Sequence, residues 1–218
     1  TARMAGFLDL QTGAYEPRLL AAAGITEAQL PRVLKPGAVA GHVHTAAAEA
    51  LGIPLGVPVC VGANDQLVGA VGAGNVRPGI ISETTGTALA LIASTEAPLF
   101  DPRIVAGRHA VPELYYAMAY NITSAIVLKW FRDLCACGEA YDSFLEGVAE
   151  IPAGCAGLTV LPHFAGTTLP SLNLDVRGAM MGLTLAHTKL HIARAIMEAC
   201  ACMLRECVEP VQQHEAAV

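Results

Sequence analysis

One carboxylate in the stretch Val57–Thr87 stands among small residues. Asp65 is the only acid there before Glu83, and it follows an apolar run that ends at Gly62. Residues with so little side-chain bulk let a backbone or a ligand approach closely. Open α/β sheets often hold a catalytic acid where a strand passes into a helix. The simpler alternative, which the residues alone favour, is that Asn64 or Asp65 caps the following helix.

A second candidate for chemistry is the pair Gly86-Thr87. It lies in the polar segment Thr84–Thr87, between two apolar segments. Hydroxyl groups and open backbone N–H groups are donors that suit a phosphate. Taken alone, such a segment is more often an ordinary β-hairpin turn.

The elements that must position these residues follow from the hydrophobic pattern. The run Val57–Val61 predicts a strand before Asp65, and a helix follows the acid. The polar segment Thr84–Thr87 becomes the turn of a predicted hairpin. The expected neighbours are strands at Ile80–Glu83, Ala88–Ile92 and Leu114–Ile122, and a helix at Ser124–Leu134 that carries Trp130 into the core.

The remaining segments carry clear boundary signals. Gly24 ends a predicted helix Glu16–Ala23, and Thr26 and Gln29 have the spacing of a capping box. Apolar residues repeat every three or four positions over Lys189–Val208, which predicts a long helix that Pro210 ends or kinks. The other predicted elements are a strand at Ala5–Leu10, a helix at Thr45–Leu51, a short strand at Gly157–Leu161 and a long loop at His163–Arg177.

Composition limits the class of protein. Of the 218 residues, 54% are hydrophobic and 15% are charged, which argues against a disordered chain. The net charge of −6 and the scattered Lys and Arg residues leave no basic stripe, so we expect no nucleic-acid partner. Prolines and glycines interrupt the apolar segments, so we expect no membrane span.

The seven cysteines are an odd number and lie in apolar segments. Such a set is typical of reduced thiols in a cytoplasmic protein. The pairs Cys135/Cys137 and Cys200/Cys202 have C-x-C spacing, and no histidine follows either pair at zinc-finger spacing. We therefore predict structural thiols and no metal ligands.

The motifs together resemble one family, the FGGY carbohydrate kinases. The strand-NDQ-helix around Asp65 and the GTxxxL hairpin at Gly86 occur there in this order. So do four later segments, which are Leu128–Asp133 (LKWFRD), Leu161–Gly166 (LPHFAG), Gly178–Leu183 (GAMMGL) and, seven residues on, His191–Glu198 (HIARAIME). Each segment alone is weakly specific, but the ordered set covers nearly all of the chain.

The resemblance implies parts of two actin-like, ribonuclease H-like α/β domains. Residues 1–77 would be the end of the first, sugar-binding domain with the catalytic aspartate, and residues 78–218 the first half of the second, nucleotide-binding domain. The family's amino-terminal phosphate loop and its late adenosine motif have no counterpart here. We therefore expect an internal fragment that is inactive alone.

The chemistry that the resemblance implies is transfer of the ATP γ-phosphoryl group to a sugar hydroxyl with Mg²⁺. Asp65 matches the family's general base, and Gln66 matches a residue that touches substrate hydroxyls. Gly86 and Thr87 match the second phosphate loop. Ser124 and Ala125 stand where many members have glycines that admit the nucleotide, so a Cβ at these positions is expected to crowd the adenosine.

The expected substrate is a ketopentose such as xylulose or ribulose, although the loop after Leu161 lacks the acid and the base usual in xylulose kinases. Alternatives are glycerol or another polyol or hexulose kinase, and a non-catalytic actin-like binding protein. The glycines Gly69, Gly72 and Gly74 have the wrong spacing for a dinucleotide site. The implied protein is cytoplasmic, and a homodimer is a candidate assembly.

Overall fold

The computed structural model describes residues 6–215 as two compact units. The first unit contains the chain up to Ile80 together with Ser94–Pro98 and Ala106–Tyr116. The second contains Ile81–Ala93, Leu99–Val105 and the chain from Ala117 onward. The chain therefore passes between the units several times.

The first unit begins with short local elements. Its helices and strands are α1 (Pro17–Ala22), a 3-10 helix (Glu27–Gln29), β1 (Val39–His42), α2 (Thr45–Leu51), β2 (Pro58–Cys60), α3 (Asp65–Gly72) and most of β5 (Val105–Arg108). The helix boundaries follow their caps, because Gly24 and Gly52 both adopt the left-handed conformation just after α1 and α2. The capping box of Thr26 and Gln29 is also present.

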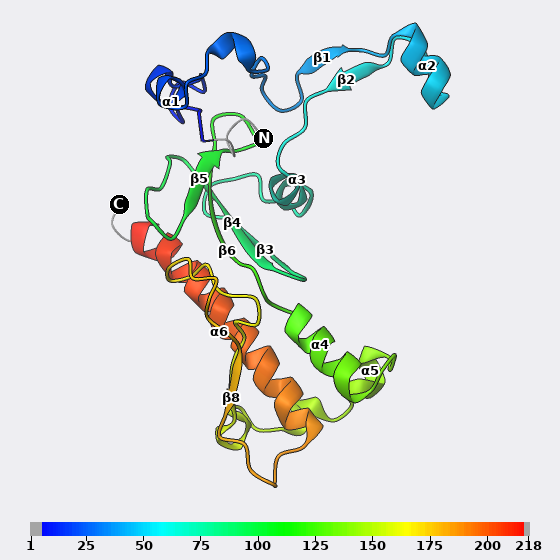
Figure 1. Ribbon diagram of the computed structural model, residues 1–218, viewed down its shortest axis with the longest axis vertical. Coiled ribbons are helices and arrows are strands. Elements are labelled where there is room, and N and C mark those ends of the chain that lie inside the picture. Colours follow the sequence, from blue (N-terminus) through cyan, green and yellow to red (C-terminus); the bar gives the residue numbers. More distant parts are fainter. Residues whose placement is uncertain (1–5, 216–218) are drawn as a thin grey trace. The chain divides into compact units, whose positions relative to one another are not determined.

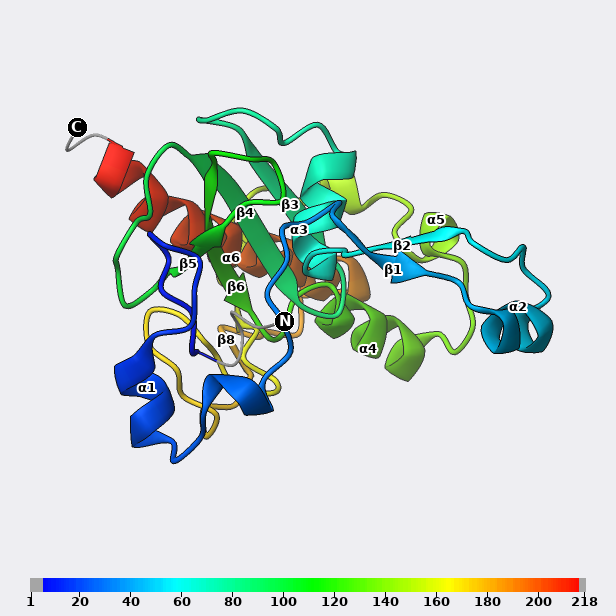
Figure 2. The ribbon, with the colours of Figure 1, turned by 90° about the horizontal axis from the view of Figure 1, so that it is seen from above.

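Strands β1 and β2 form an antiparallel ribbon, with α2 at its far end (Figure 2). None of β1, α2 and β2 buries a side chain. The structure confirms a strand within the predicted segment Val57–Val61, at Pro58–Cys60. The side chains of this strand are exposed, because it belongs to an uncovered ribbon. A ribbon of two strands exposes both faces unless another layer covers it.

One prediction for the first unit was wrong, the strand at Ala5–Leu10, and one strand was missed. The segment Gly6–Leu10 is a turn with a single bridge, Leu8 to Tyr15, and Ala5 lies outside the described residues. The Asp9 carboxylate accepts hydrogen bonds from the Thr12 backbone and hydroxyl, which favours a turn over an extended strand. The strand β1 was not predicted, because Val39–His42 contains alanine and glycine and lacks a strand pattern.

The second unit contains most of a four-stranded sheet of order β3-β4-β6-β5 (Figure 1). Its strands are β3 (Ile81–Thr85), β4 (Leu89–Thr95) and β6 (Tyr115–Asn121), and β3 and β4 pair antiparallel as predicted. The remaining elements are α4 (Ile126–Cys135), α5 (Tyr141–Phe144), 3-10 helices at Val148–Glu150 and Cys155–Gly157, β7 (Thr159–Leu161), β8 (Ala179–Met181) and α6 (Lys189–Glu215). The strand β8 pairs with β7 and was not predicted.

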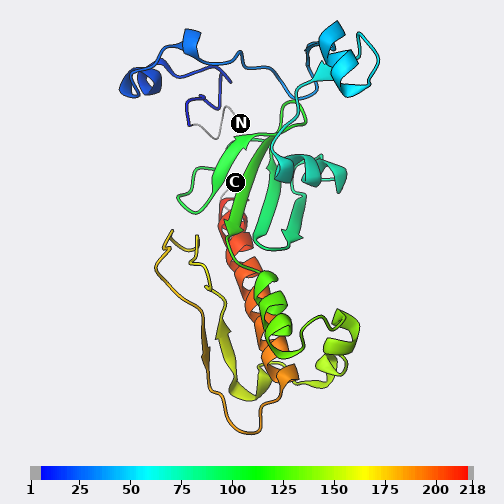
Figure 3. The ribbon, with the colours of Figure 1, turned by 45° about the vertical axis from the view of Figure 1, so that its right-hand side comes forward.

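The long helix α6 organises the core of the second unit. It packs against α4 and β7 (Figure 3). One buried cluster joins it to the sheet through Cys207, Val211 and Leu91, and a second joins it to α4 through Ala193, Ile196 and Val127 among others. The α6 members of these clusters come from the predicted apolar stripe and its continuation.

At Pro210 we expected α6 to end or to kink. The helix does not end there, because α6 continues to Glu215 with Pro210 and Val211 fully buried. Burial of this apolar turn offsets the hydrogen bond that a proline removes. Trp130 is 43% exposed rather than a core residue, because Val127 and Phe131 occupy the inner face of α4.

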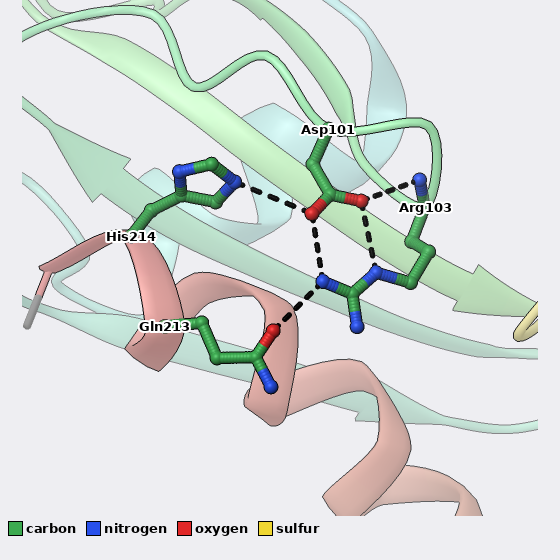
Figure 4. A network of polar contacts seen from close by, with 4 residues as sticks. All are labelled: Asp101, Arg103, Gln213 and His214. Carbon is green, nitrogen blue, oxygen red and sulfur yellow. Dashed lines mark hydrogen bonds and ion pairs between the residues drawn. The ribbon is translucent and has the colours of Figure 1, made fainter. Parts of the chain in front are cut away.

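A polar network joins the loop before β5 to the last turn of α6 (Figure 4). The Asp101 carboxylate accepts from Arg103 Nε at 2.9 Å and from Arg103 Nη2 at 2.7 Å, and it lies 3.2 Å from His214 Nε2. Arg103 Nη2 also donates to Gln213 Oε1. The Arg103 guanidinium holds the pKa of Asp101 well below its usual range.

The cysteines are free thiols with varied exposure. Cys155 and Cys207 are buried as expected, and burial raises the pKa of the Cys207 thiol to about 12. Cys60, Cys135, Cys137 and Cys202 are exposed, which corrects the apolar setting expected for them. Within residues 6–215, no helix combines the length and the apolar composition that crossing a membrane requires.

Candidate active site

Asp65 is the first residue of α3, and its carboxylate is exposed. Asn64 is the N-cap, and its Oδ1 accepts a hydrogen bond from the Gln66 N–H at 3.1 Å. Asp65 Oδ1 accepts from the same N–H at 2.8 Å, and no described residue donates to Asp65 Oδ2. Because Asn64 already caps the helix, Asp65 is not needed for that task. Gln66 is half-buried beside it.

The Gly86-Thr87 pair forms the tip of the β3–β4 hairpin. The last paired residues are Thr85 and Leu89, so the loop consists of residues 86–88, all exposed. The Gly86 N–H donates to the Ala88 carbonyl at 2.9 Å. A Cβ built on Gly86 would meet no atom within 4 Å, so the space beside this backbone is open to a ligand.

The loop lies against the beginning of α4. The Ser124 N–H donates to the Thr87 carbonyl at 3.0 Å, which brings together two positions 37 residues apart in the sequence (124 − 87). Ala125 is the N-cap of α4 and supplies no side-chain hydrogen bond. The start of a helix without a side-chain cap carries partial positive charge and suits an anion. The structure thus unites Thr87, Ser124 and Ala125.

The side chain of Ser124 is fully buried. It faces the Cys200 thiol of α6, a contact that lowers the pKa of this thiol while burial, the larger effect, raises it. No described residue gives Ser124 Oγ a hydrogen bond of ordinary geometry. The Ser124 side chain thus points into the core, and the crowding of a nucleotide by the Cβ atoms of Ser124 and Ala125 stays a prediction.

The two halves of the candidate site belong to different units. Asp65 and Gln66 lie in the first unit, whereas Gly86, Thr87, Ser124 and Ala125 lie in the second. No group of three or more His, Cys, Asp or Glu side chains in residues 6–215 forms a metal cluster.

Comparison with known proteins identifies the family. The N-terminal domain model of the FGGY family of carbohydrate kinases matches residues 1–72, and the C-terminal domain model matches residues 82–218. The chain belongs to the FGGY family of carbohydrate kinases.

Relatives within the FGGY family have several substrates. A gluconokinase of Bacillus licheniformis is 30% identical over 204 residues, which are 88% of this chain and 40% of the relative. A xylulose kinase of Bacillus subtilis is 30% identical over 69% of this chain and 31% of the relative. The crystal structure of xylulose kinase from Rhodospirillum rubrum matches 92% of this chain and 41% of its own, with a TM-score of 0.80 and 34% identity.

These matches establish the fold. The chain contains parts of two domains of the actin-like, ribonuclease H-like fold, as expected from its motifs. It spans about 40% of the length of the gluconokinase that it matches.

Several FGGY segments that the sequence singled out serve packing. Phe164 of the LPHFAG segment packs on Trp130, with ring centroids 5.0 Å apart, and lies directly against Gly178. The Glu198 carboxylate accepts from the Gly154 N–H at 3.1 Å and from Arg194 Nε at 2.9 Å. The contact between Glu198 and Gly154 connects the end of the HIARAIME segment to the residue before the 3-10 helix Cys155–Gly157.

Sequence reasoning missed a buried polar group in the first unit. Asn75, Ser94 and His109 meet there although they are far apart in the sequence. Their spacing matches no motif, so only the long-range fold brings them together.

Proposed function

We propose that the protein containing these residues is a kinase that transfers the γ-phosphoryl group of ATP to a sugar hydroxyl, with Asp65 as the general base. The observation that carries this proposal is the exposed Asp65 carboxylate at the start of α3, where Asn64 already serves as the cap. Membership of the FGGY family supports the reaction class. We also propose residues 1–77 and 78–218 as the two domain parts.

The first half-site supplies proton transfer and substrate contact. A sugar hydroxyl is a weak nucleophile until a base accepts its proton, and a positioned carboxylate contributes roughly 10²–10⁴ in rate. Asp65 Oδ2 is the oxygen available for this proton, because Oδ1 accepts from the Gln66 N–H. The Gln66 side chain would contact the substrate hydroxyls.

The second half-site suits the phosphates of a nucleotide. The Gly86 backbone lies in open space, and the Thr87 hydroxyl is exposed beside it. The partial positive charge at the start of α4 adds attraction for an anion. ATP with Mg²⁺ supplies the phosphoryl group and charge neutralisation when bound, and Mg²⁺ in such sites is held largely by phosphates and water.

For the substrate, we propose a ketopentose such as xylulose or ribulose. A xylulose kinase structure at 34% identity and a TM-score of 0.80 supports this class. Gluconate is the second candidate, because a gluconokinase covers 88% of the chain and a gluconate kinase structure from Lactobacillus acidophilus reaches a TM-score of 0.84. Glycerol and other polyols or hexuloses remain alternatives.

The test is a coupled assay of ADP release from MgATP by the longest natural polypeptide that contains these 218 residues. The panel consists of xylulose, ribulose, gluconate and glycerol. We expect turnover with one ketopentose well above the sugar-free rate. Turnover with gluconate alone would replace the substrate, and a folded protein that is silent across the panel would overturn the kinase proposal.

A further inference from the structure

Three polar side chains from separate segments are buried together in the first unit. Asn75 follows α3, Ser94 lies near the end of β4, and His109 follows β5. Asn75 and Ser94 are 0% exposed and His109 is 4% exposed. Burial of so much polar surface is costly unless every group finds a partner, so the arrangement calls for a reason.

The hydrogen bonds run in one direction through the group. The Val111 N–H donates to His109 Nδ1 at 3.0 Å, so neutral His109 carries its proton on Nε2. His109 Nε2 lies 3.2 Å from Ser94 Oγ and donates to it. Ser94 Oγ in turn donates to Asn75 Oδ1 at 2.6 Å. Such a satisfied, buried network holds its members in one geometry.

Asn75 connects this network to the end of α3. Gly74 adopts φ +87°, the Gly74 N–H donates to the Val71 carbonyl, and the Asn75 N–H donates to the Ala70 carbonyl at 2.9 Å. This is a Schellman motif, in which the residue after the glycine closes the helix. The backbone of Asn75 thus ends α3 while its side chain enters the buried network.

Few side chains of α3 are buried, and these are Leu67 and Ala70. A helix with so little buried surface depends on the attachment of its ends for its direction. Asn75 provides that attachment, at the opposite end of the helix from Asp65.

We propose that Ser94 and His109, acting through Asn75, are positioning residues that fix the direction of α3 and therefore the location of the Asp65 carboxylate. The inference rests on the proposed role of Asp65 as the base. A helix of eight residues is about 12 Å long, so a tilt of about 10° at one end moves the other by about 2 Å. A displacement of about 1 Å can cost roughly 10²-fold in rate.

The test compares two neighbouring buried hydroxyls on β4 in the 218-residue chain. Ser94→Ala removes the donor to Asn75. The matched control, Thr95→Val, removes a hydroxyl that donates to the Ala97 carbonyl, outside the network. NMR measures two quantities. The first is the rate of amide hydrogen exchange in α3, and the second is the ¹³C chemical shift of the Asp65 carboxyl carbon.

We expect Ser94→Ala to speed exchange of the α3 amides at least about tenfold and to move the Asp65 carboxyl resonance, and Thr95→Val to do neither. Unchanged readouts in Ser94→Ala, or equal changes in both variants, would overturn the proposal. If Ser94→Ala does not fold, Asn75→Ala takes its place, because it leaves the contact between Ser94 and His109 intact. Both readouts are independent of kinase activity, so they stand even if Asp65 proves not to be the base.

Discussion

Gly178 lies so close to the ring of Phe164 that a Cβ on the glycine would stand 2.2 Å from ring atom Cδ2. The same ring packs on Trp130, with centroids 5.0 Å apart. This contact explains physically why a glycine precedes the segment Ala179–Met181. It also connects two segments by which the sequence resembles its family.

We predict that Gly178→Ala lowers the free energy of unfolding of the second unit by about 1–3 kcal/mol, because the added methyl group overpacks this contact. Thermal denaturation followed by the fluorescence of Trp130, the only tryptophan, reports this change directly. The control Gly86→Ala places its methyl group in open space and should stay within about 0.5 kcal/mol. Equal stability of the two variants would contradict the predicted clash.

The Asp101 network predicts a local effect on α6. Asp101→Asn removes the charge that Arg103 and His214 face, so the last turn of α6 should loosen, with a cost of about 1–3 kcal/mol. The measure is hydrogen exchange of the amides in residues 209–214. The exposed pair of Arg205 and Glu209 on the same helix provides the control, and Arg205→Gln should cost no more than about 0.5 kcal/mol. Equal exchange in the two variants would show that the Asp101 network does not secure this turn.

Local signals in the sequence were sufficient for most helices. Gly24 and Gly52 ended α1 and α2 because a glycine accepts the left-handed conformation at a helix end. The apolar repeat of α6 was visible over several turns, and its stripe does form the core. Pro210 left an end and a kink open, and α6 continues past it because tertiary packing of the last turns outweighs the local preference against proline.

Long-range contacts set the limit for the site. The sequence singled out Asp65 and Thr87 by residue type and order, but nothing in it separates a base from a cap. The structure assigns the cap to Asn64, and the role of Asp65 as the base stays a prediction. Ser94 and His109 are 15 residues apart and belong to no sequence repeat, so the sequence alone does not predict their contact.

His109 predicts a pH dependence for the first unit. Burial lowers the pKa of His109 below its ordinary value of 6.5, so the unfolded chain takes up a proton more readily than the folded unit. This contribution to stability is complete above about pH 6.5 and is lost as the pH falls through the folded pKa, with a slope of up to about 1.4 kcal/mol per pH unit.

The measurement is thermal denaturation at pH 7.5 and pH 5.5, followed by circular dichroism. His109→Gln cannot titrate and should lose most of the difference that the original chain shows between the two pH values. A difference of the same size in both proteins would assign the pH dependence to other histidines.

Removal of two adjacent buried hydroxyls before α4 should have different effects on stability. Thr123 Oγ1 donates to the Pro162 carbonyl at 2.7 Å, so Thr123→Val leaves that carbonyl without its partner and should cost about 1–3 kcal/mol. Ser124 Oγ has no hydrogen-bond partner of ordinary geometry among the described residues and faces the Cys200 thiol, so Ser124→Ala should be neutral or slightly stabilising. Unfolding followed by Trp130 fluorescence measures both. A loss in Ser124→Ala as large as that in Thr123→Val would show that the Ser124 hydroxyl has a stronger partner.

The proposed base can be separated from the cap by two neighbouring substitutions. Asp65→Asn keeps the side-chain shape but cannot accept the substrate proton, so kcat should fall about 10²–10⁴-fold while KM for the sugar stays within a few-fold. Asn64→Ala removes the cap and keeps the carboxylate, so it should cost about 1 kcal/mol of stability and leave most of the turnover. Both are assayed by ADP release in the longest natural polypeptide that contains the chain. Turnover that survives in Asp65→Asn, or an equal loss of kcat in folded Asn64→Ala, would mean that α3 presents something other than a base.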